Sequence, residues 1–367
     1  GQTYGVSVTD GSLISGGDTN AGTSGGGLSG VFVDATSTIA GDISNSGAIL
    51  GALAGTWAGT VSGIAVAGKV TRIVNSGLIE AGTTPGASSV PGAFAIQVSS
   101  TGTITDGITN SGLLTASGVD IFNGGIGIEA GGSIGGGITN SGTVGGMLAV
   151  SMIDGGTIGG GITNAGTIGG AFAGIVMTNG ATISGALGNS GVIAGTLAGV
   201  IAFYGSTISG GITNSGTIAG TVAAILIDET SVVPVIRNLA GGLIDGAIAT
   251  GNAATQVTNA GTIAMPAGTT STIAGNYVQE ATGMLRTRVA DDVTYGKLSV
   301  CGTVVLPSNA RIDVDVTTPA HAFTVSGLPD VIAAGTLVSD GTFAVTDNST
   351  LFDFSAVKGS PRFQCNK

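Results

Sequence analysis

The stretch Ile212-Thr213-Asn214-Ser215-Gly216-Thr217-Ile218 recurs in variant form along most of the chain. Successive copies lie 21 to 35 residues apart. Self-similarity at such a period is the signature of a repeat architecture, in which each unit supplies one layer of a stack. The repeated Asn falls at Asn20, Asn45, Asn75, Asn110, Asn140, Asn164, Asn189, Asn214, Asn238 and Asn259.

Apolar residues keep fixed positions around this Asn. They stand six and two residues before it and four after it, as Ile158, Ile162 and Ile168 do in the unit of Asn164. All three offsets are even, so they lie on one face of an extended chain. Each unit therefore supplies about three strands of three to five residues, which bury that face only if units stack. We predict an all-β fold: a right-handed parallel β-helix of about ten repeat coils plus a C-terminal β-helical cap.

We assign a structural role to the repeated Asn residues. Stacked Asn amides can hydrogen-bond along the axis as a ladder, and Asn tolerates the left-handed backbone conformation at a corner. The Gly two residues later is expected to supply a positive φ where the corner needs one. The predicted ladder comprises Asn45, Asn75, Asn110, Asn140, Asn164, Asn189, Asn214, Asn238 and Asn259.

Two departures from the repeat are informative. In the first unit, Asp18 and Ser24 stand where Ile is expected, which predicts an atypical coil at the N-terminal end of the stack. The longest spacings contain Trp57, Pro85 and Pro91. These insertions are expected to project as loops from one corner, and loops carry function more often than the layers they connect.

Composition excludes several classes of protein. Gly accounts for 70 of the 367 residues, but not at every third position, and Pro for only 8, which excludes collagen. Residues 155–227 carry no charge, yet polar residues and Gly pairs interrupt them too often for a membrane-spanning helix. A net charge of −11 disfavours nucleic acid as a partner. The start at Gly1, without Met or a charged region, predicts a processed or truncated product.

A search for chemistry yields little. The only His is His321, so a serine hydrolase using Ser24, within Gly22-Thr-Ser-Gly-Gly26, would depend on it. Glu129 and Asp154 differ by 25 residues and are the best candidates for stacked carboxylates of a polysaccharide-active β-helix enzyme. A solvated edge is the favoured interpretation of that pair. We therefore expect no catalytic residue, no cofactor and no metal ligand.

The pattern changes near residue 275 to longer alternating strands, and here a resemblance enters. The segments Gly275-Asn276-Tyr277-Val278-Gln279, Tyr295-Gly296-Lys297-Leu298 and Leu306-Pro307-Ser308-Asn309-Ala310, with the segment 343–354, resemble the junction module of bacterial autotransporters of the type V secretion family. In that family the module is the autochaperone region that caps the passenger β-helix.

The resemblance implies a division of the chain and a location. Residues 1–275 would form the repeat stalk, 276–357 an autochaperone-like β cap, and 358–367 an irregular tail. The protein would be exported by a Gram-negative bacterium to its surface or beyond. Family members continue into an outer-membrane barrel, which would here have been cleaved, omitted or never present.

Two cysteines, Cys301 and Cys365, depart from the family, whose passengers generally avoid cysteine. Three interpretations compete: an intrachain disulfide, an interchain link and two free thiols. An oxidising exterior favours a bond, and we favour the intrachain one.

These observations support a leading hypothesis and two alternatives. The first is an extracellular structural or adhesive passenger that mediates attachment, self-association or biofilm formation. The second is a fibre subunit that stacks head to tail, since the ends of a β-helix are open strand edges. The third is the polysaccharide-active enzyme. The expected partners are other copies of the chain and host or environmental surfaces, and not nucleic acid; the chain itself is not expected to span a membrane.

Overall fold

The computed structural model describes residues 3–51, 61–82, 92–117 and 123–359. Within these ranges every regular element is a β-strand. Strands pair in parallel with their counterparts one coil earlier and one coil later, as β20 (Thr167–Met177) does with β17 (Thr143–Met152) and with β23 (Val192–Gly195). The fold is a right-handed parallel β-helix, which confirms the architecture predicted from the repeat.

The strands follow one another in chain order. The first ten are β1 (Tyr4–Val8), β2 (Leu13–Ile14), β3 (Asp18–Asn20), β4 (Thr23–Gly26), β5 (Ser29–Val33), β6 (Thr38–Asn45), β7 (Ala48–Gly51), β8 (Val61–Val66), β9 (Lys69–Asn75) and β10 (Leu78–Gly82). The next ten are β11 (Ala93–Val98), β12 (Thr103–Asn110), β13 (Leu113–Ser117), β14 (Gly124–Ile128), β15 (Ser133–Ile134), β16 (Ile138–Asn140), β17, β18 (Thr157–Ile158), β19 (Ile162–Asn164) and β20.

The remaining strands complete the repeats and the C-terminal coils. They are β21 (Thr182–Ile183), β22 (Leu187–Asn189), β23, β24 (Ala198–Ala202), β25 (Thr207–Ile208), β26 (Ile212–Asn214), β27 (Thr217–Ile227), β28 (Val235–Asn238), β29 (Leu243–Thr250), β30 (Gln256–Asn259), β31 (Thr262–Met265), β32 (Thr270–Ile273), β33 (Asn276–Gln279), β34 (Met284–Val289), β35 (Lys297–Val305), β36 (Ala310–Val316), β37 (Ile332–Val338) and β38 (Phe343–Asp347).

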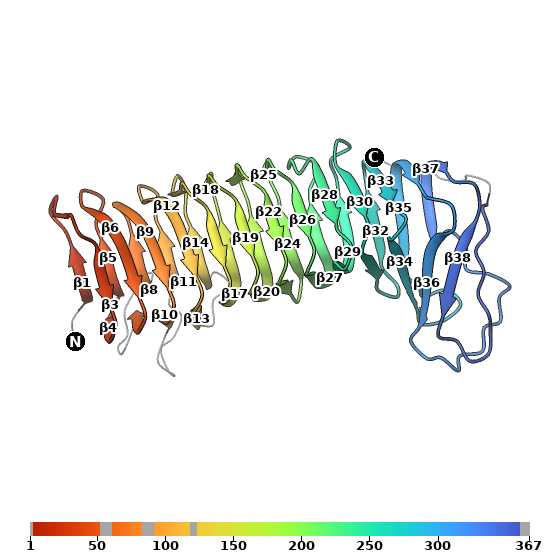
Figure 1. Cartoon of the computed structure of the whole chain (residues 1–367), viewed down its shortest axis with the longest axis horizontal. Coiled ribbons are helices and arrows are strands. Elements are labelled where there is room, and N and C mark those ends of the chain that lie inside the picture. Colours follow the sequence, from red (N-terminus) through yellow and green to blue (C-terminus); the bar gives the residue numbers. More distant parts are fainter. Residues whose placement is uncertain (1–2, 52–60, 83–91, 118–122, 360–367) are drawn as a thin grey trace.

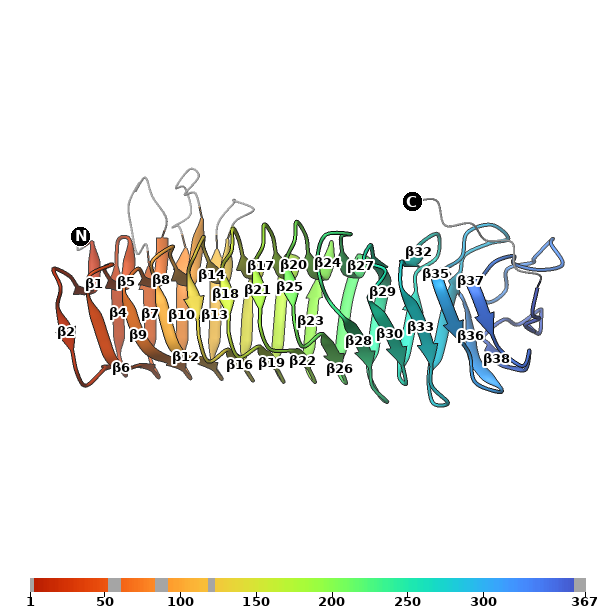
Figure 2. The same ribbon diagram turned by 90° about the horizontal axis from the view of Figure 1, so that it is seen from above.

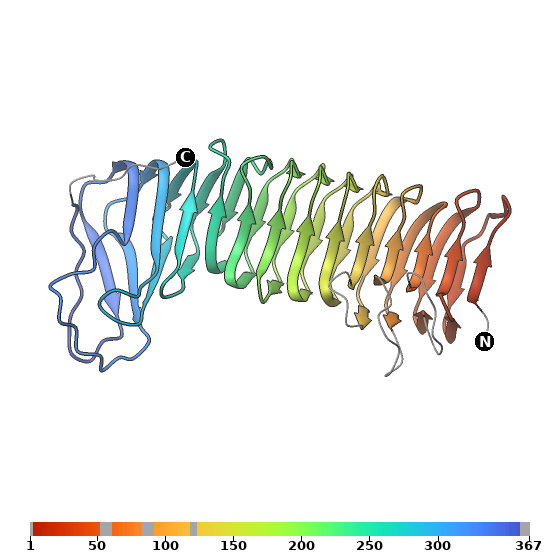
Figure 3. The ribbon, with the colours of Figure 1, turned by 180° about the vertical axis from the view of Figure 1, so that it is seen from behind.

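The coils stack into a rod with β1 at one end and β38 at the other (Figure 1; Figure 3 shows the opposite side). Viewed after a quarter turn, the strands again form straight rows along the axis (Figure 2). One hydrophobic core fills the rod from Val8 to Ala334. The sequence change near residue 275 does not interrupt this core, because β33 continues the stack on β30. A smaller cluster around Val289, Tyr295 and Val316 is added in the C-terminal coils.

The inward positions are those that the even offsets predict. Ile158, Ile162 and Ile168 are at most 1% exposed, and each stacks on its counterparts in neighbouring coils. The strands differ from the prediction in length, since β20 and β27 each run for 11 residues. A Gly at the bend, such as Gly170, lets the chain change direction while its hydrogen-bonded pairing continues.

The Asn side chains form a continuous ladder along the axis. From Asn20 to Asn259, each Nδ2 donates a hydrogen bond to the Oδ1 of the next Asn at 2.7–2.9 Å. Each amide also donates within its own turn and to the next coil; for Asn164 these acceptors are the carbonyls of Gly166 and Val192. All donors and acceptors of a buried amide column are thereby matched to partners.

The expected left-handed backbone at these Asn residues is wrong. Each ladder Asn ends a strand, and the described non-Gly residues with positive φ lie elsewhere, at Asp10, Asp154, Asn179, Tyr204, Asn309 and Asp330. The side chain points into the rod. Asn is therefore required at this position for the hydrogen bonds of its side-chain amide, and not for its ability to adopt a positive φ. An amide that both donates and accepts along the axis is what the column requires.

The Gly two residues after the Asn is also present for a different reason than predicted. These glycines do not have positive φ. A Cβ added at Gly166 or Gly191 would lie 2.1 Å from the carbonyl oxygen of the corresponding Gly in the preceding coil. The turns therefore stack in backbone-to-backbone contact, and only a residue without a side chain fits between them.

The ladder continues one coil beyond the last Asn. Asn259 Nδ2 lies 3.4 Å from the hydroxyl of Tyr277, which lies 3.3 Å from Gln279 Oε1. Gln279 pairs with Asn259 in register, and its Nε2 donates to the carbonyls of Gly283 and Arg311 as an Asn amide would. Complete burial raises the pKa of the Tyr277 hydroxyl, so this linking group stays protonated.

Ion pairs join the repeat coils to the C-terminal coils. Arg288 on β34 reaches across β31 to Asp245 on β29, with Nη1–Oδ1 and Nη2–Oδ2 distances of 2.7 and 3.2 Å. Asp315 lies 3.6 Å from the Nε of the same arginine, and Arg286 pairs with Asp313 at 2.6 Å. Asp313 and Asp315, on one face of β36, thus hold neighbouring coils together.

Acidic side chains stabilise turns of the coil before them. Asp10 and Tyr204 both have positive φ. The backbone amide of Asp10 donates a hydrogen bond to the Asp34 carboxylate, and that of Tyr204 donates one to the Asp228 carboxylate. Hydrogen bonds from the Ser37 side chain and from the amides of Asp10 and Thr36 lower the pKa of Asp34 to about 2. Bonds from Ser308 and Thr342 do the same for Asp340.

These carboxylates predict a loss of stability in acid. Their folded-state pKa lies below the ordinary value of 3.8, so ionisation favours the folded state. That contribution is complete above about pH 4 and is lost as the pH falls toward 2. We expect the thermal midpoint to fall over this window, and to fall less steeply in Asp34→Asn. The exposed Asp353, as Asp353→Asn, is the control; an acid slope identical in all three proteins would contradict the assignment.

A buried hydroxyl offers a test of the core. Thr250 is 2% exposed between Ile227 and Ile273, and its Oγ1 has no partner among the described residues. We expect Thr250→Val to raise the free energy of unfolding by about 1 kcal/mol, because an unsatisfied buried polar group is removed without changing shape. The matched control is Thr287→Val, which removes a hydrogen bond of 2.7 Å to the carbonyl of Gly296. It is expected to cost about 1 kcal/mol in urea titrations.

Candidate functional site

The best carboxylate pair in the sequence is not a pair in the structure. Asn140 and Asn164 are 24 residues apart, so Glu129 is level with Ile153, whose amide bonds to the carbonyl of Ile128. Glu129 accepts a hydrogen bond from Gln97 on the N-terminal side, whereas Asp154 accepts one from Asn179 on the C-terminal side. The two carboxylates are turned toward opposite neighbours, so the stacked pair that the polysaccharide-active alternative requires does not form.

The other chemical candidates are also separated. Ser24 lies on β4 near the N-terminal end, and His321 follows β36 near the C-terminal end, where its ring contacts Phe323 edge-on at 4.6 Å. The structure therefore does not bring the two together. Cys301 lies half-buried on β35, and Cys365 lies outside the described residues, so their pairing stays a prediction. Trp57, Pro85 and Pro91 are likewise outside the described ranges.

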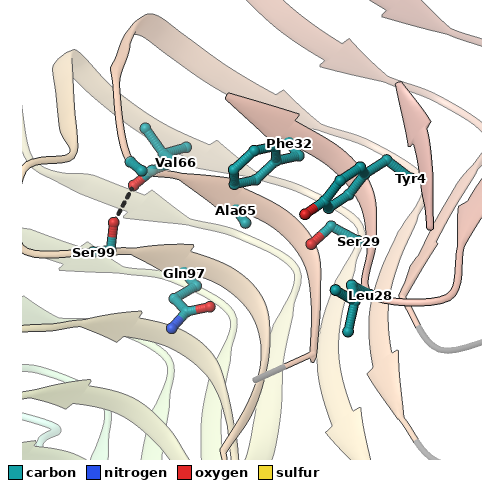
Figure 4. A pocket seen from close by; sticks show the side chains of 9 residues that line it. Tyr4, Leu28, Ser29, Phe32, Ala65, Val66, Gln97 and Ser99 are labelled. Carbon is teal, nitrogen blue, oxygen red and sulfur yellow. Dashed lines mark hydrogen bonds between the residues drawn. The ribbon is translucent and has the colours of Figure 1, made fainter. Parts of the chain in front are cut away.

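A small pocket opens on the outer face of the N-terminal coils. The rings of Tyr4 on β1 and Phe32 on β5 stack at 4.6 Å with an interplanar angle of 12°. Beside them a cavity of about 150 Å³ is bounded by Leu28 and Ser29 and by the polar side chains of β11 and its following turn. Figure 4 shows the aromatic pair on one side of this pocket and Gln97 on the other.

Gln97, which lines the pocket, belongs to a chain of hydrogen bonds. Ser62 Oγ donates to Gln97 Oε1 at 2.6 Å, and Gln97 Nε2 donates to Glu129 Oε1 at 2.5 Å. Ser62 and Gln97 are buried, so the chain fixes the amide in one orientation and holds a carboxylate at its end. Ser99 donates to the carbonyl of Val66 at the rim. Aromatic faces beside fixed polar groups suit a ligand that has both apolar and hydroxyl-bearing surfaces.

This pocket has no single sequence motif. Phe32, Ala65 and Gln97 occupy the same outward position of three successive coils, since Phe32 pairs with Ala65 and Ala65 with Gln97. The sequence signal for the pocket is therefore a set of residues that share one register position in coils of unequal length. It becomes visible only once the register through β8 is known, because the insertions in this region shift the spacing from one coil to the next.

The described residues contain no group of three or more His, Cys, Asp or Glu side chains that could bind a metal ion. They also contain no helix with the length and apolar character needed to cross a bilayer. The fold places the chain among the parallel β-helix solenoids. Comparison with protein-family models, curated proteins and solved structures finds no match to this chain.

Proposed function

We propose that this chain is the passenger of a type V secretion protein, exported by a Gram-negative bacterium, and that it acts outside the cell as a stalk for attachment. The observation that carries the proposal is the unbroken core and amide ladder between the N-terminal pocket and the C-terminal coils. Such a rod holds a site at one end far from a membrane at the other. The resemblance of residues 275–354 to the autochaperone module supports this orientation.

The test is attachment by the purified chain coupled to beads through its C-terminal end. We expect binding to cell surfaces or glycan-coated surfaces above that of albumin-coated beads. Replacing the aromatic pair in Tyr4→Ala/Phe32→Ala is expected to reduce this binding about tenfold, because aromatic anchors dominate recognition sites. The control is Leu13→Ala, which changes an exposed apolar residue in the same coil as Tyr4. Wild-type binding no greater than that of albumin would overturn the proposal.

End-to-end fibre assembly is the second candidate, and one observation favours it. The half-buried apolar residues that border the main core lie at the two ends of the rod: Val6 and Ile14 in the first coil, Ile332, Leu337 and Phe343 in the last coils. The outer edges of β1 and β38 have no strand partner among the described residues. Electron microscopy decides this candidate: dispersed single rods at high concentration would exclude it.

A further inference from the structure

An apolar ridge runs along one corner of the rod. At the bend that follows Gly170, Gly195 and Gly220, successive coils project Phe172, Leu197 and Val222. The three lie one coil apart, because the Leu197 amide bonds to the Phe172 carbonyl and the Leu197 carbonyl accepts from Ala223. Phe172 is 42% exposed and Val222 55% exposed, while Leu197 between them is half-buried. Exposed large apolar side chains in neighbouring coils are candidates for a contact surface. The row lies on β20, the turn after β23, and β27, which belong to three successive coils.

A groove lies directly beside this ridge. Its volume is about 530 Å³, and its floor consists of small residues in three successive coils: Gly169 and Gly170, Ala194 and Gly195, and Ala219 and Gly220. A Cβ added at Gly170, Gly195 or Gly220 would lie within 2.4 Å of a carbonyl oxygen of the same bend. The tight bend that pushes the ridge outward thus also requires a floor without side chains. The Asp245–Arg288 ion pair and Pro266 close the C-terminal end.

Apart from the Asp245–Arg288 ion pair at its C-terminal end, the groove and the ridge beside it are built from uncharged residues. Residues 155–227 contain no Asp, Glu, Lys, Arg or His, although the chain as a whole has a net charge of −11. A second apolar cluster, formed by Leu148, Ala173, Ala198 and Ile201, lies outside the main core and is buried. Leu197 of the ridge packs against it, together with the partly buried Val176, Phe203 and Leu226. Two negatively charged rods approach here without direct like-charge contacts.

We propose that the ridge and the groove form the two halves of a self-complementary interface with a second copy of the chain. A two-fold axis parallel to the rod places the ridge of each copy over the groove of the other, with Leu197 of one above Ala194 and Gly195 of its partner. The two rods then run in the same direction. An antiparallel pair would instead place ridge against ridge, which leaves both grooves empty. An isologous contact of this kind closes as a dimer.

This inference goes beyond the proposed attachment role because it assigns a surface for self-association, and purified protein alone suffices for its test. Sedimentation equilibrium should show a dimer. Val222→Asp is expected to raise the dissociation constant about 100-fold, since it places an unpaired charge on the ridge within the contact. The control is Val192→Asp, which adds the same charge to a 39%-exposed site at the start of β23, outside the ridge and groove. Circular dichroism of both variants verifies the fold.

Direction is tested by energy transfer between chains labelled at the N-terminus with a donor or an acceptor dye. Parallel pairing brings the two N-termini together and gives efficient transfer, whereas antiparallel pairing separates them by about the length of the rod. Three outcomes would each overturn the proposal. The wild-type chain could be monomeric at 100 μM, or Val192→Asp could weaken dimerisation as much as Val222→Asp does. The third outcome is a dimer without energy transfer. Binding of a monomer to phosphatidylglycerol vesicles would assign the ridge to lipid instead. Loss of attachment with dimerisation intact would count against adhesion alone.

Discussion

Asn164→Asp is expected to destabilise the rod by about 4 kcal/mol at neutral pH. Asn164 is fully buried, and its Nδ2 faces three acceptors: Asn189 Oδ1 and the carbonyls of Gly166 and Val192. A carboxylate has the same shape but no donor, so the substitution directs a negative charge at three oxygens. Hydrogen exchange should show the loss as opening of the coils on either side of residue 164, together with a lower midpoint in urea.

The same variant should regain stability in mild acid. Burial among acceptors raises the folded-state pKa of the introduced carboxyl above its unfolded value, so its neutral form, which can donate one hydrogen bond, returns as the pH falls. The comparison is made between pH 7 and pH 5, above the window in which Asp34 and Asp340 titrate. Asn179→Asp, on an exposed turn, is the control and should cost about 1 kcal/mol or less. Equal losses at positions 164 and 179 would contradict a structural ladder.

Gly191→Ala is expected to destabilise the rod by about 3 kcal/mol or more. The added Cβ would lie 2.1 Å from the carbonyl oxygen of Gly166, and both atoms belong to backbones held by strand pairing on either side. No side chain can rotate away to relieve the contact. Two neighbouring coils must therefore separate locally, which breaks the hydrogen bonds that stack them.

Gly188, three residues earlier in the same coil, supplies a matched control. A Cβ at Gly188 meets only a carbonyl oxygen at 3.9 Å, and its neighbours in the column are Thr163 and Thr213. Gly188→Ala is expected to leave stability unchanged or to raise it by about 0.5 kcal/mol, because Gly is unfavourable inside a strand. Urea titration of the two variants separates close packing from glycine content. A similar loss in both would refute the backbone contact as the reason for the Gly column.

The features that sequence reasoning recovers are those repeated in every unit. The even offsets of Ile158, Ile162 and Ile168 identify the inward face, and their burial follows from it. The reason for the Gly column was not recoverable, because a close approach between coils leaves the same residue in the sequence as a positive φ. The continuation of the ladder at Gln279 was hidden too, since Gln there is identified only by its pairing with Asn259.

The site residues depend on register, which the sequence specifies only where coils have equal lengths. A coil of 24 residues instead of 25 moves Asp154 one position away from Glu129 and ends the apparent pair. Phe32 and Gln97 share a column across coils of 33 and 32 residues, for which no constant period exists. The reach of Arg288 to Asp245, two coils back, is likewise a property of the stack and of no single repeat.

The amide ladder has a direction, because every Nδ2 points toward the C-terminal neighbour and every Oδ1 toward the N-terminal one. A stack that grows from its C-terminal coils therefore presents only oxygen acceptors at this position to the next coil, which adds on its N-terminal face. Only a segment that brings an amide to that place completes the column. In the unit of Asn214, a displacement by a single residue brings Thr213 or Ser215, each with a single donor on a shorter side chain. Each coil thus favours the correct alignment of the next one. The ladder therefore disfavours misaligned coils in a chain whose repeats are similar enough to stack in the wrong register.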